Sequence, residues 1–233
     1  MKITNPSRLP GRQFRRPVLF GLLLASLVAV GSAAHAGILR DVLAKVGIGA
    51  DKPPVNANGD AVVFPREGYL CCNLHRDGSS VSDSNYATLP DVLKAGTPVT
   101  VIGYGRNRAN IDVNGTAMEF DHDFGRDQES LDAWVNKIVI PTDPRGRVLA
   151  ASPAVKAAIS ASKVVLGMTR QQVLLSVGYP PANLTKSTDD AVWKLWASRH
   201  AEYQLHFGDD GRLTSVTGDG EITQHVIYLP TRH

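Results

Sequence analysis

The chain lacks the residue patterns that usually mark an enzyme site. It contains no Gly-x-Ser-x-Gly elbow, no His-Glu-x-x-His pair and no glycine-rich loop that would cradle a phosphate. Its two cysteines, Cys71 and Cys72, are adjacent, whereas zinc sites usually space their cysteines by about two to four residues. We therefore expect no catalytic residue, no cofactor and no metal site.

The sequence has one long apolar run, from Pro17 to Val30. This run is shorter than the roughly 20 apolar residues that a membrane-spanning helix needs. A basic stretch precedes the run and Ala34-His35-Ala36 follows it, which is the three-part layout of a cleavable export signal. The sequence therefore predicts that residues 1–36 are removed and that the mature chain is secreted into a bacterial periplasm. A twin-arginine route, suggested by Arg15-Arg16, fits the neighbouring residues less well.

Two further absences exclude classes of partner. No cysteine directly follows the apolar run, as lipid anchoring would require, so we expect no permanent membrane anchor in the mature chain. Residues 1–36 hold five of the 25 basic residues and none of the 22 acidic ones, which leaves 20 against 22 and a net charge of −2. The positive charge of the whole chain thus belongs to the export signal, and we expect no nucleic-acid partner.

The 197 residues after residue 36 are enough for two small domains with hydrophobic cores. Residues 37–60 combine a short amphipathic segment with a linker rich in Gly, Pro and Asn. Residues 61–140 show short strands broken by turn residues and end in a helix. Residues 148–233 show two helices followed by strands. The predicted fold class is α+β.

The clearest element of the first module is a β-hairpin around Asn114-Gly115, a strong two-residue turn. A further strand is expected over residues 96–102, with Pro98 near its start. Helical spacing predicts a helix over Asp127–Lys137, capped by Asp127 or a neighbour. Residues 61–125 resemble a small bacterial SH3-like barrel. Three cross-strand pairs are predicted across the turn: Val113 with Thr116, Ile111 with Met118, and Ala109 with Phe120.

The second module carries stronger helix signals. Ser152-Pro153 pairs a cap residue with proline at the first helical position, which predicts a short helix there. A capping box formed by Thr169 and Gln172 predicts a second helix over Arg170–Val177. Four antiparallel strands are expected beyond Asp190, the last over Ile222–Leu229.

Residues 163–216 resemble a known family. The stretch Gly167-Met-Thr-Arg-Gln-Gln-Val-Leu-Leu-Ser-Val-Gly-Tyr-Pro-Pro181, followed by Trp193 and by Phe207-Gly-Asp-Asp-Gly-Arg-Leu213, resembles the small outer-membrane lipoproteins called BamE, SmpA or OmlA. The resemblance implies two helices on an antiparallel sheet, a fold used mainly as a docking surface in the bacterial envelope. The lipoprotein cysteine is missing and an extra module precedes the match, so only fold and compartment are carried over.

The densest polar cluster is the candidate binding site. Arginines there could grip a ligand carboxylate or phosphate. The structural interpretation, which we favour, is that these arginines pair with Asp121, Asp123 and Glu129 and fasten the helix onto the barrel. The candidate binding residues are Arg106, Arg108, His122, Arg126 and Glu129.

The adjacent cysteines Cys71 and Cys72 are unusual in a chain that is expected to be exported, because thiols in an oxidising compartment normally form disulfides. Adjacent Cα atoms lie about 3.8 Å apart, below the usual disulfide range of about 4.4–6.8 Å, and strand neighbours point to opposite faces. We therefore expect one buried and one exposed thiol, with a vicinal or intermolecular disulfide and a metal site as alternatives. For Trp193, Trp196 and Tyr203 we favour core positions over an exposed aromatic patch.

These observations predict a non-catalytic periplasmic binding or scaffold protein of the bacterial cell envelope. We expect it to contribute to envelope or outer-membrane assembly by contacting envelope protein or peptidoglycan. The alternative is a periplasmic redox or hydrolytic enzyme that uses Cys71, Cys72 and the cluster around His122. The partner's identity and the oligomeric state do not follow from the residues.

Overall fold

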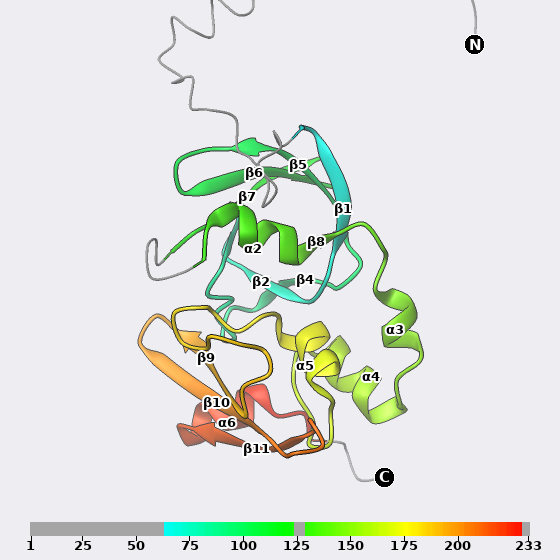
Figure 1. Cartoon of the computed structure of the whole chain (residues 1–233), viewed down its shortest axis with the longest axis vertical. Coiled ribbons are helices and arrows are strands. Elements are labelled where there is room, and N and C mark those ends of the chain that lie inside the picture. Colours follow the sequence, from blue (N-terminus) through cyan, green and yellow to red (C-terminus); the bar gives the residue numbers. More distant parts are fainter. Residues whose placement is uncertain (1–62, 124–128, 230–233) are drawn as a thin grey trace, which may run out of the picture. The chain divides into compact units, whose positions relative to one another are not determined.

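The computed structural model describes residues 63–123 and 129–229 (Figure 1). These residues fall in one compact unit of mixed α and β structure, which carries two hydrophobic cores. We call residues 63–140 the β-lobe and residues 141–229 the α/β-lobe. The predicted export signal and linker over 1–60 lie outside the described residues. Within the described ranges, every helix is too short or too polar to cross a membrane.

The β-lobe is built on a six-stranded sheet with the strand order β3-β7-β6-β5-β1-β8. Neighbouring strands are antiparallel except β3 and β7, which run parallel. Two strands, β2 and β4, form a separate antiparallel pair. The strand bounds are β1 Arg66–Leu70, β2 Leu74–Arg76, β3 Ser80–Ser82, β4 Asp91–Leu93, β5 Pro98–Tyr104, β6 Arg108–Val113, β7 Thr116–Asp121 and β8 Val139–Ile140.

The predicted hairpin is confirmed as β6 and β7, and its three predicted cross-strand pairs are all present. Asn114 and Gly115 both have positive φ, 53° and 81°, as the tight two-residue turn requires. Alternate side chains of both strands point into the core, because successive residues of a strand face opposite sides of the sheet. The strand predicted over 96–102 is β5, which begins at Pro98.

Helix α2 (Leu131–Ile138) is shorter at its start than the sequence predicted. Its cap is Ser130, whose side chain accepts a hydrogen bond from the backbone N–H of Ala133. The buried side chains of this helix, Trp134, Val135 and Ile138, pack on the sheet. The rings of Trp134 and Phe120 meet edge to face with centroids 5.4 Å apart. In Figure 1 this helix lies beside β6 and β7.

The α/β-lobe contains a three-stranded antiparallel sheet with the order β11-β10-β9. Two predictions are confirmed there: a helix that begins at Pro153, and a helix over Arg170–Val177 with both hydrogen bonds of the capping box. These helices pack against the sheet through a shared core that includes Trp193 and Tyr203. The bounds are α3 Arg145–Leu149, α4 Pro153–Ser160, α5 Arg170–Val177, β9 Val192–Ser198, β10 Ala201–Phe207, β11 Leu213–Gly218 and α6 Gly220–Val226.

The fourth strand predicted over Ile222–Leu229 is wrong, because helix α6 occupies most of that span. The Asp219 side chain accepts a hydrogen bond from the backbone N–H of Glu221, so the preceding glycine-rich turn starts a helix instead of reversing a strand. His225, expected in a strand, therefore lies on α6. Helix α3 was not predicted and falls in the stretch assigned to the module boundary.

Asn73 joins the two lobes through buried hydrogen bonds. Its backbone N–H donates to the Leu175 carbonyl at 3.0 Å. Its side-chain Nδ2 donates to the Ile159 carbonyl at 2.6 Å and to Ser162 Oγ at 3.0 Å. Its Oδ1 accepts from the backbone N–H of Ala95 at 2.9 Å. With the residue 1% exposed, these bonds leave little of its polar surface to water.

Asn85 makes a second link of the same kind. Its Nδ2 donates to the Val177 carbonyl at 2.7 Å, and its Oδ1 accepts from the backbone N–H of His75 at 2.6 Å. Gly178 lies against this amide, and a Cβ at Gly178 would lie only 2.7 Å from Asn85 Nδ2, which is too close. The φ angle of Gly178 is 79°, in the region that favours glycine. Glycine at the end of α5 thus allows the Asn85 amide to approach the helix.

We expect Asn73→Ala to lower the free energy of unfolding by about 2–3 kcal/mol, because the partners of the lost amide stay buried without hydrogen bonds. Urea unfolding of the purified chain measures this change. Asn110→Ala, at an exposed position of β6, is the matched control and should change stability by less than about 0.5 kcal/mol. Equal effects of the two substitutions would contradict the role given to Asn73.

Candidate functional site

The structure describes four of the five predicted binding residues, which come from the turn between β5 and β6, the strands next to it and the segment before α2. Arg106 is exposed in the turn between β5 and β6. His122 follows β7, and Glu129 precedes α2. Arg108 lies on β6 and is exposed. Arg126 lies outside the described residues.

The ion pairs of this region differ from the predicted ones. Arg108 pairs with Glu119 at 2.7 Å, although Asp121 is its direct partner in the strand register. The hydrogen bond that Arg108 donates to Glu119, followed by the charges of Glu119 and Asp121, raises the pKa of Arg108. Glu129 pairs with Lys137 on α2. The helix is therefore held to the sheet mainly by its buried apolar side chains.

Cys71 and Cys72 form a disulfide with each other, and both are buried. The expectation of one buried and one exposed thiol is thus corrected. That expectation assumed a regular strand, whereas the two residues occupy a bend between β1 and β2, where neighbouring side chains need not point to opposite faces. Their position in the core of the β-lobe leaves no described thiol beside His122.

Two of the three aromatic residues that were expected in the core, Trp193 and Tyr203, occupy core positions. Trp193 and Tyr203 are 0% and 1% exposed, and Trp196 is half-buried. Burial raises the pKa of Tyr203 because the phenolate would lose its hydration. These rings therefore contribute packing, and they do not form the exposed patch that was the alternative.

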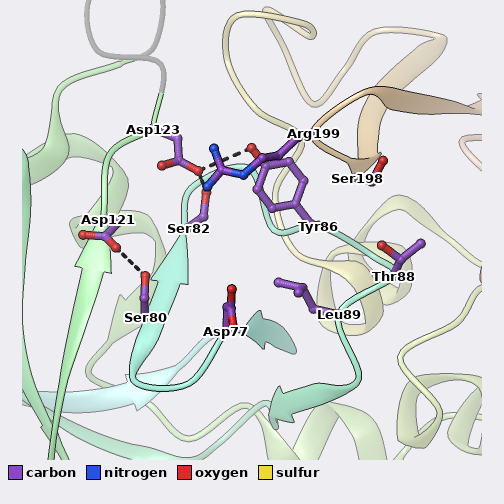
Figure 2. A pocket seen from close by; sticks show the side chains of 10 residues that line it. All are labelled: Asp77, Ser80, Ser82, Tyr86, Thr88, Leu89, Asp121, Asp123, Ser198 and Arg199. Carbon is purple, nitrogen blue, oxygen red and sulfur yellow. Dashed lines mark hydrogen bonds between the residues drawn. The ribbon is translucent and has the colours of Figure 1, made fainter.

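A polar pocket of about 250 Å³ gathers side chains from both lobes and is our candidate site (Figure 2). It lies where three segments meet: the stretch from Asp77 to Leu89, the end of β7, and the turn between β9 and β10. We call it the carboxylate pocket. Its lining residues are Asp77, Ser80, Ser82, Tyr86, Thr88, Leu89, Asp121, Asp123, Ser198 and Arg199.

A ladder of hydroxyl and carboxylate groups forms one wall of this pocket. Parallel pairing of β3 with β7 sets Val81 beside Phe120, and both side chains are fully buried in the core. Because strand side chains alternate, the flanking serines point to the opposite face together with the aspartates. Two hydrogen bonds result: Ser80 Oγ to Asp121 Oδ2, and Ser82 Oγ to Asp123 Oδ2 at 2.5 Å.

The opposite wall carries Tyr86 and Arg199. The Tyr86 hydroxyl donates to Asp123 Oδ2 at 3.4 Å, and the Arg199 guanidinium lies 5.7 Å from the centre of the tyrosine ring (Figure 2). Burial raises the pKa of Tyr86, so its hydroxyl remains protonated at neutral pH. Thr88 fixes this wall to β9, because its N–H and its hydroxyl both donate to the Ala197 carbonyl.

Asp83 and His122 support the ladder from behind. His122 Nδ1 lies 2.7 Å from Asp83 Oδ2, and Asp83 Oδ1 accepts from the backbone N–H of Asp123 at 3.1 Å. Burial raises the pKa of Asp83, although its bonds to Asp123 and His122 act in the opposite direction. The imidazole and the carboxylate thus hold the end of β7 in place next to the pocket.

The lining carries three carboxylates against one guanidinium, so its charge is negative at neutral pH. Carboxylate oxygens accept hydrogen bonds, while the hydroxyls of Ser80, Ser82 and Tyr86 can both donate and accept. Such a set suits a ligand rich in hydroxyl, amide or ammonium groups. Within the described ranges, His, Cys, Asp and Glu side chains form no cluster that could hold a metal ion.

Most of the pocket was missed at the sequence level. Among the described candidates, His122 touches the ladder through Asp83, and Arg108 is the register partner of Asp121. The signal that could have found the site is the alternation Ser80-Val81-Ser82 beside Asp121-His122-Asp123, but matching the two stretches requires the parallel register of β3 and β7. Arg199 carried no signal, because it belongs to a turn that is remote in sequence.

Comparisons with known proteins identify no family. No family model matches the chain, and no curated protein matches it. A solved structure, the C-terminal domain of TagH, matches 67% of this chain and 78% of that chain, with 14% sequence identity and a TM-score of 0.18. A TM-score this low supports no argument about fold or function.

The raised pKa of Asp83 predicts a pH effect on stability. Its folded pKa lies above its ordinary value of 3.8, so the stability that it contributes is complete below that value and is lost as the pH rises through the folded pKa. In the Asp83→Asn variant the asparagine side chain carries no charge at any pH, so this loss of stability with rising pH should disappear. Urea unfolding between about pH 4 and pH 7 should show the natural chain losing stability relative to the variant. A difference that is independent of pH would contradict the assignment.

Proposed function

We propose that this chain is a non-catalytic binding protein of the bacterial cell envelope, and that it recognises peptidoglycan through the carboxylate pocket. The observation that carries the proposal is the pocket itself. Three segments from both lobes bring carboxylate, hydroxyl, aromatic and guanidinium groups to one hollow. In small-molecule sites, a small number of precisely placed polar groups fixes the orientation of the ligand, and this lining supplies such groups.

The chemistry of peptidoglycan suits this lining. Its fragments combine sugar hydroxyls and amides with peptide stems that carry ammonium groups. Asp77, Asp121 and Asp123 can accept hydrogen bonds from all three kinds of donor, and a bond between a carboxylate and an ammonium group is charge-assisted. Arg199 can meet a carboxylate at the end of a peptide stem. The Tyr86 ring offers an apolar surface beside these groups.

The arrangement of the serines favours binding over catalysis. Ser80 and Ser82 each donate their hydroxyl proton to a carboxylate of the ladder. A serine nucleophile of the common triad type would instead place its hydroxyl against a histidine that is oriented by a third group. The ladder therefore supports a role in which the pocket holds a ligand without changing it.

We further infer that the β-lobe is an SH3-like module and that the α/β-lobe is BamE-like. A hairpin-rich sheet closed by α2 supports the first assignment, and two helices on a three-stranded antiparallel sheet support the second. Both resemblances indicate docking modules. A scaffold role in envelope or outer-membrane assembly, through envelope protein or peptidoglycan, follows from them as part of the proposal.

One observation favours a hydrolytic alternative. The imidazole of His122 is oriented by Asp83, which is 3% exposed at its side chain, and this pairing resembles the base and its orienting acid in hydrolases. A redox role for Cys71 and Cys72 lacks such support, since the disulfide lies in the core. Product analysis in the binding experiment below separates hydrolysis from binding.

We expect soluble disaccharide-peptide fragments of peptidoglycan to bind the purified chain, as measured by isothermal titration calorimetry. Asp121→Asn and Asp123→Asn should each weaken binding about tenfold or more, because each removes the charge from a hydrogen bond worth roughly 1.5–3 kcal/mol. The fragments should keep their masses after incubation with the chain.

Asp209→Asn is the matched control, since it makes the same charge change at an exposed turn residue between β10 and β11. It should leave the affinity unchanged. Absence of binding by the natural chain, or equal affinity of all three variants, would overturn the proposed ligand. Cleaved fragments would replace the binding role with the hydrolytic one.

The location in the periplasm has its own test. We expect the chain that is recovered from its bacterial host to begin at Gly37, because the signal-peptide layout places cleavage after Ala36. Mass spectrometry of the N-terminal peptide after separation of periplasm and cytosol measures this directly. Cytosolic protein that still carries residues 1–36 would contradict export.

A further inference from the structure

A second hollow, of about 300 Å³, lies on another part of the surface. It is formed by the segment before β5 together with helices α3 and α4, and its walls are mostly apolar. Ile159 at its floor is buried, whereas Leu149 at its edge is 72% exposed. An apolar side chain with that exposure beside a hollow indicates a surface suited to an apolar ligand. We call this hollow the basic groove.

Three cations surround the apolar walls: Lys94, Arg145 and Lys156. The described residues that line the groove include no Asp or Glu. Arg145 is already neutralised by Asp143, whose Oδ2 lies 2.7 Å from Arg145 Nε. Lys156 is half-buried and forms no ion pair within the described part of the chain. The groove therefore has an excess of positive charge at its rim.

Lys94 is held in a fixed position at this rim. Its Nζ donates to the Ser160 carbonyl at 2.9 Å and to Ser162 Oγ at 3.1 Å, which uses two of its three N–H groups. Burial lowers the pKa of Lys94, so an anion bound nearby would stabilise its charged form. The side chain is thus ordered before any ligand arrives and keeps one donor for it.

We propose that the basic groove binds a single-chain fatty carboxylate, with its hydrocarbon chain against Val148, Leu149 and Ile159 and its carboxylate between Lys94 and Lys156. The two carboxylate oxygens match the two ammonium groups that are not neutralised by an acidic neighbour. The groove shares no lining residue with the carboxylate pocket, so this site goes beyond the function proposed above.

The size of the groove favours one chain over a larger ligand. A hollow of about 300 Å³ is at the lower end of small-molecule sites, which range over roughly 300–1,000 Å³. A two-chain phospholipid would leave much of its hydrocarbon in water. An acidic peptide would bury only one apolar side chain in the groove, and it therefore serves as the competing outcome.

The test uses saturated carboxylates of eight, ten and twelve carbons with the purified chain, all below their micelle concentrations, in isothermal titration calorimetry. Affinity should rise about fourfold for each added methylene while the groove has room, because burial of one methylene contributes about 0.8 kcal/mol. A neutral alcohol of twelve carbons should bind at least about tenfold more weakly than the carboxylate of the same length. Carbon-13 methyl spectra should shift at Val148, Leu149 and Ile159.

Matched substitutions test the two parts of the site. Lys156→Gln should weaken carboxylate binding about tenfold, and Leu149→Ser should reduce the gain per methylene. Lys194→Gln and Leu166→Ser make the same changes at exposed positions outside the groove and should leave the affinity unchanged. None of these four residues lines the carboxylate pocket, so peptidoglycan binding should stay the same in every variant.

Several results would overturn the proposal. An alcohol or alkylamine that binds as tightly as the carboxylate would remove the role of the lysines. Methyl shifts confined to other parts of the chain would place the ligand elsewhere. Tighter binding of dodecyl phosphate than of the twelve-carbon carboxylate would assign the groove to a phosphate headgroup, and binding of a Glu- and Leu-rich peptide alone would assign it to a protein partner.

Discussion

Two buried asparagine side chains link the two lobes of the described chain. Asn73 and Asn85 lie in the β-lobe, yet their amides donate to carbonyls of α4 and α5 that are 86 and 92 residues further along the chain. Buried amides are expensive to leave without partners, so each lobe stabilises the other in a single arrangement. The carboxylate pocket depends on this arrangement, because Tyr86 and Thr88 follow Asn85 directly and Arg199 belongs to the other lobe.

Local signals in the sequence were enough for the elements whose geometry is decided by a few neighbours. The turn at Asn114-Gly115 set the hairpin register, and the capping box at Thr169 set the start of α5. The failures concern positions where one local pattern permits two structures. Gly218-Asp219-Gly220 suits a strand reversal as well as a helix cap, and a regular strand was assumed at Cys71-Cys72 where the chain bends. Prediction of the pocket would have required the pairing of β3 with β7, and no local sequence pattern indicates that pairing.

The carboxylate pocket and the basic groove have opposite chemistry. The carboxylate pocket has hydroxyl and carboxylate groups around a negative interior, whereas the basic groove has apolar walls below lysine and arginine. A ligand that suits one would be repelled or poorly solvated in the other. The two ligands that we propose, a polar polymer and an amphiphile, are molecules of the space between cell wall and membrane. Asn73 lines the basic groove and also holds the lobes together, so a ligand there would contact the residue that fixes the pocket's two walls.

The parallel pairing of β3 with β7 has a consequence for the order of folding. Antiparallel neighbours such as β6 and β7 can pair as soon as their short turn forms. The chain between β3 and β7 is much longer, because it contains β4, β5 and β6. Pairing across such a separation is slow, because closing a long loop costs conformational entropy before the new contacts stabilise it. The serine and aspartate ladder is therefore expected to form after the β6–β7 hairpin, and ligand recognition requires that β3 has paired with β7.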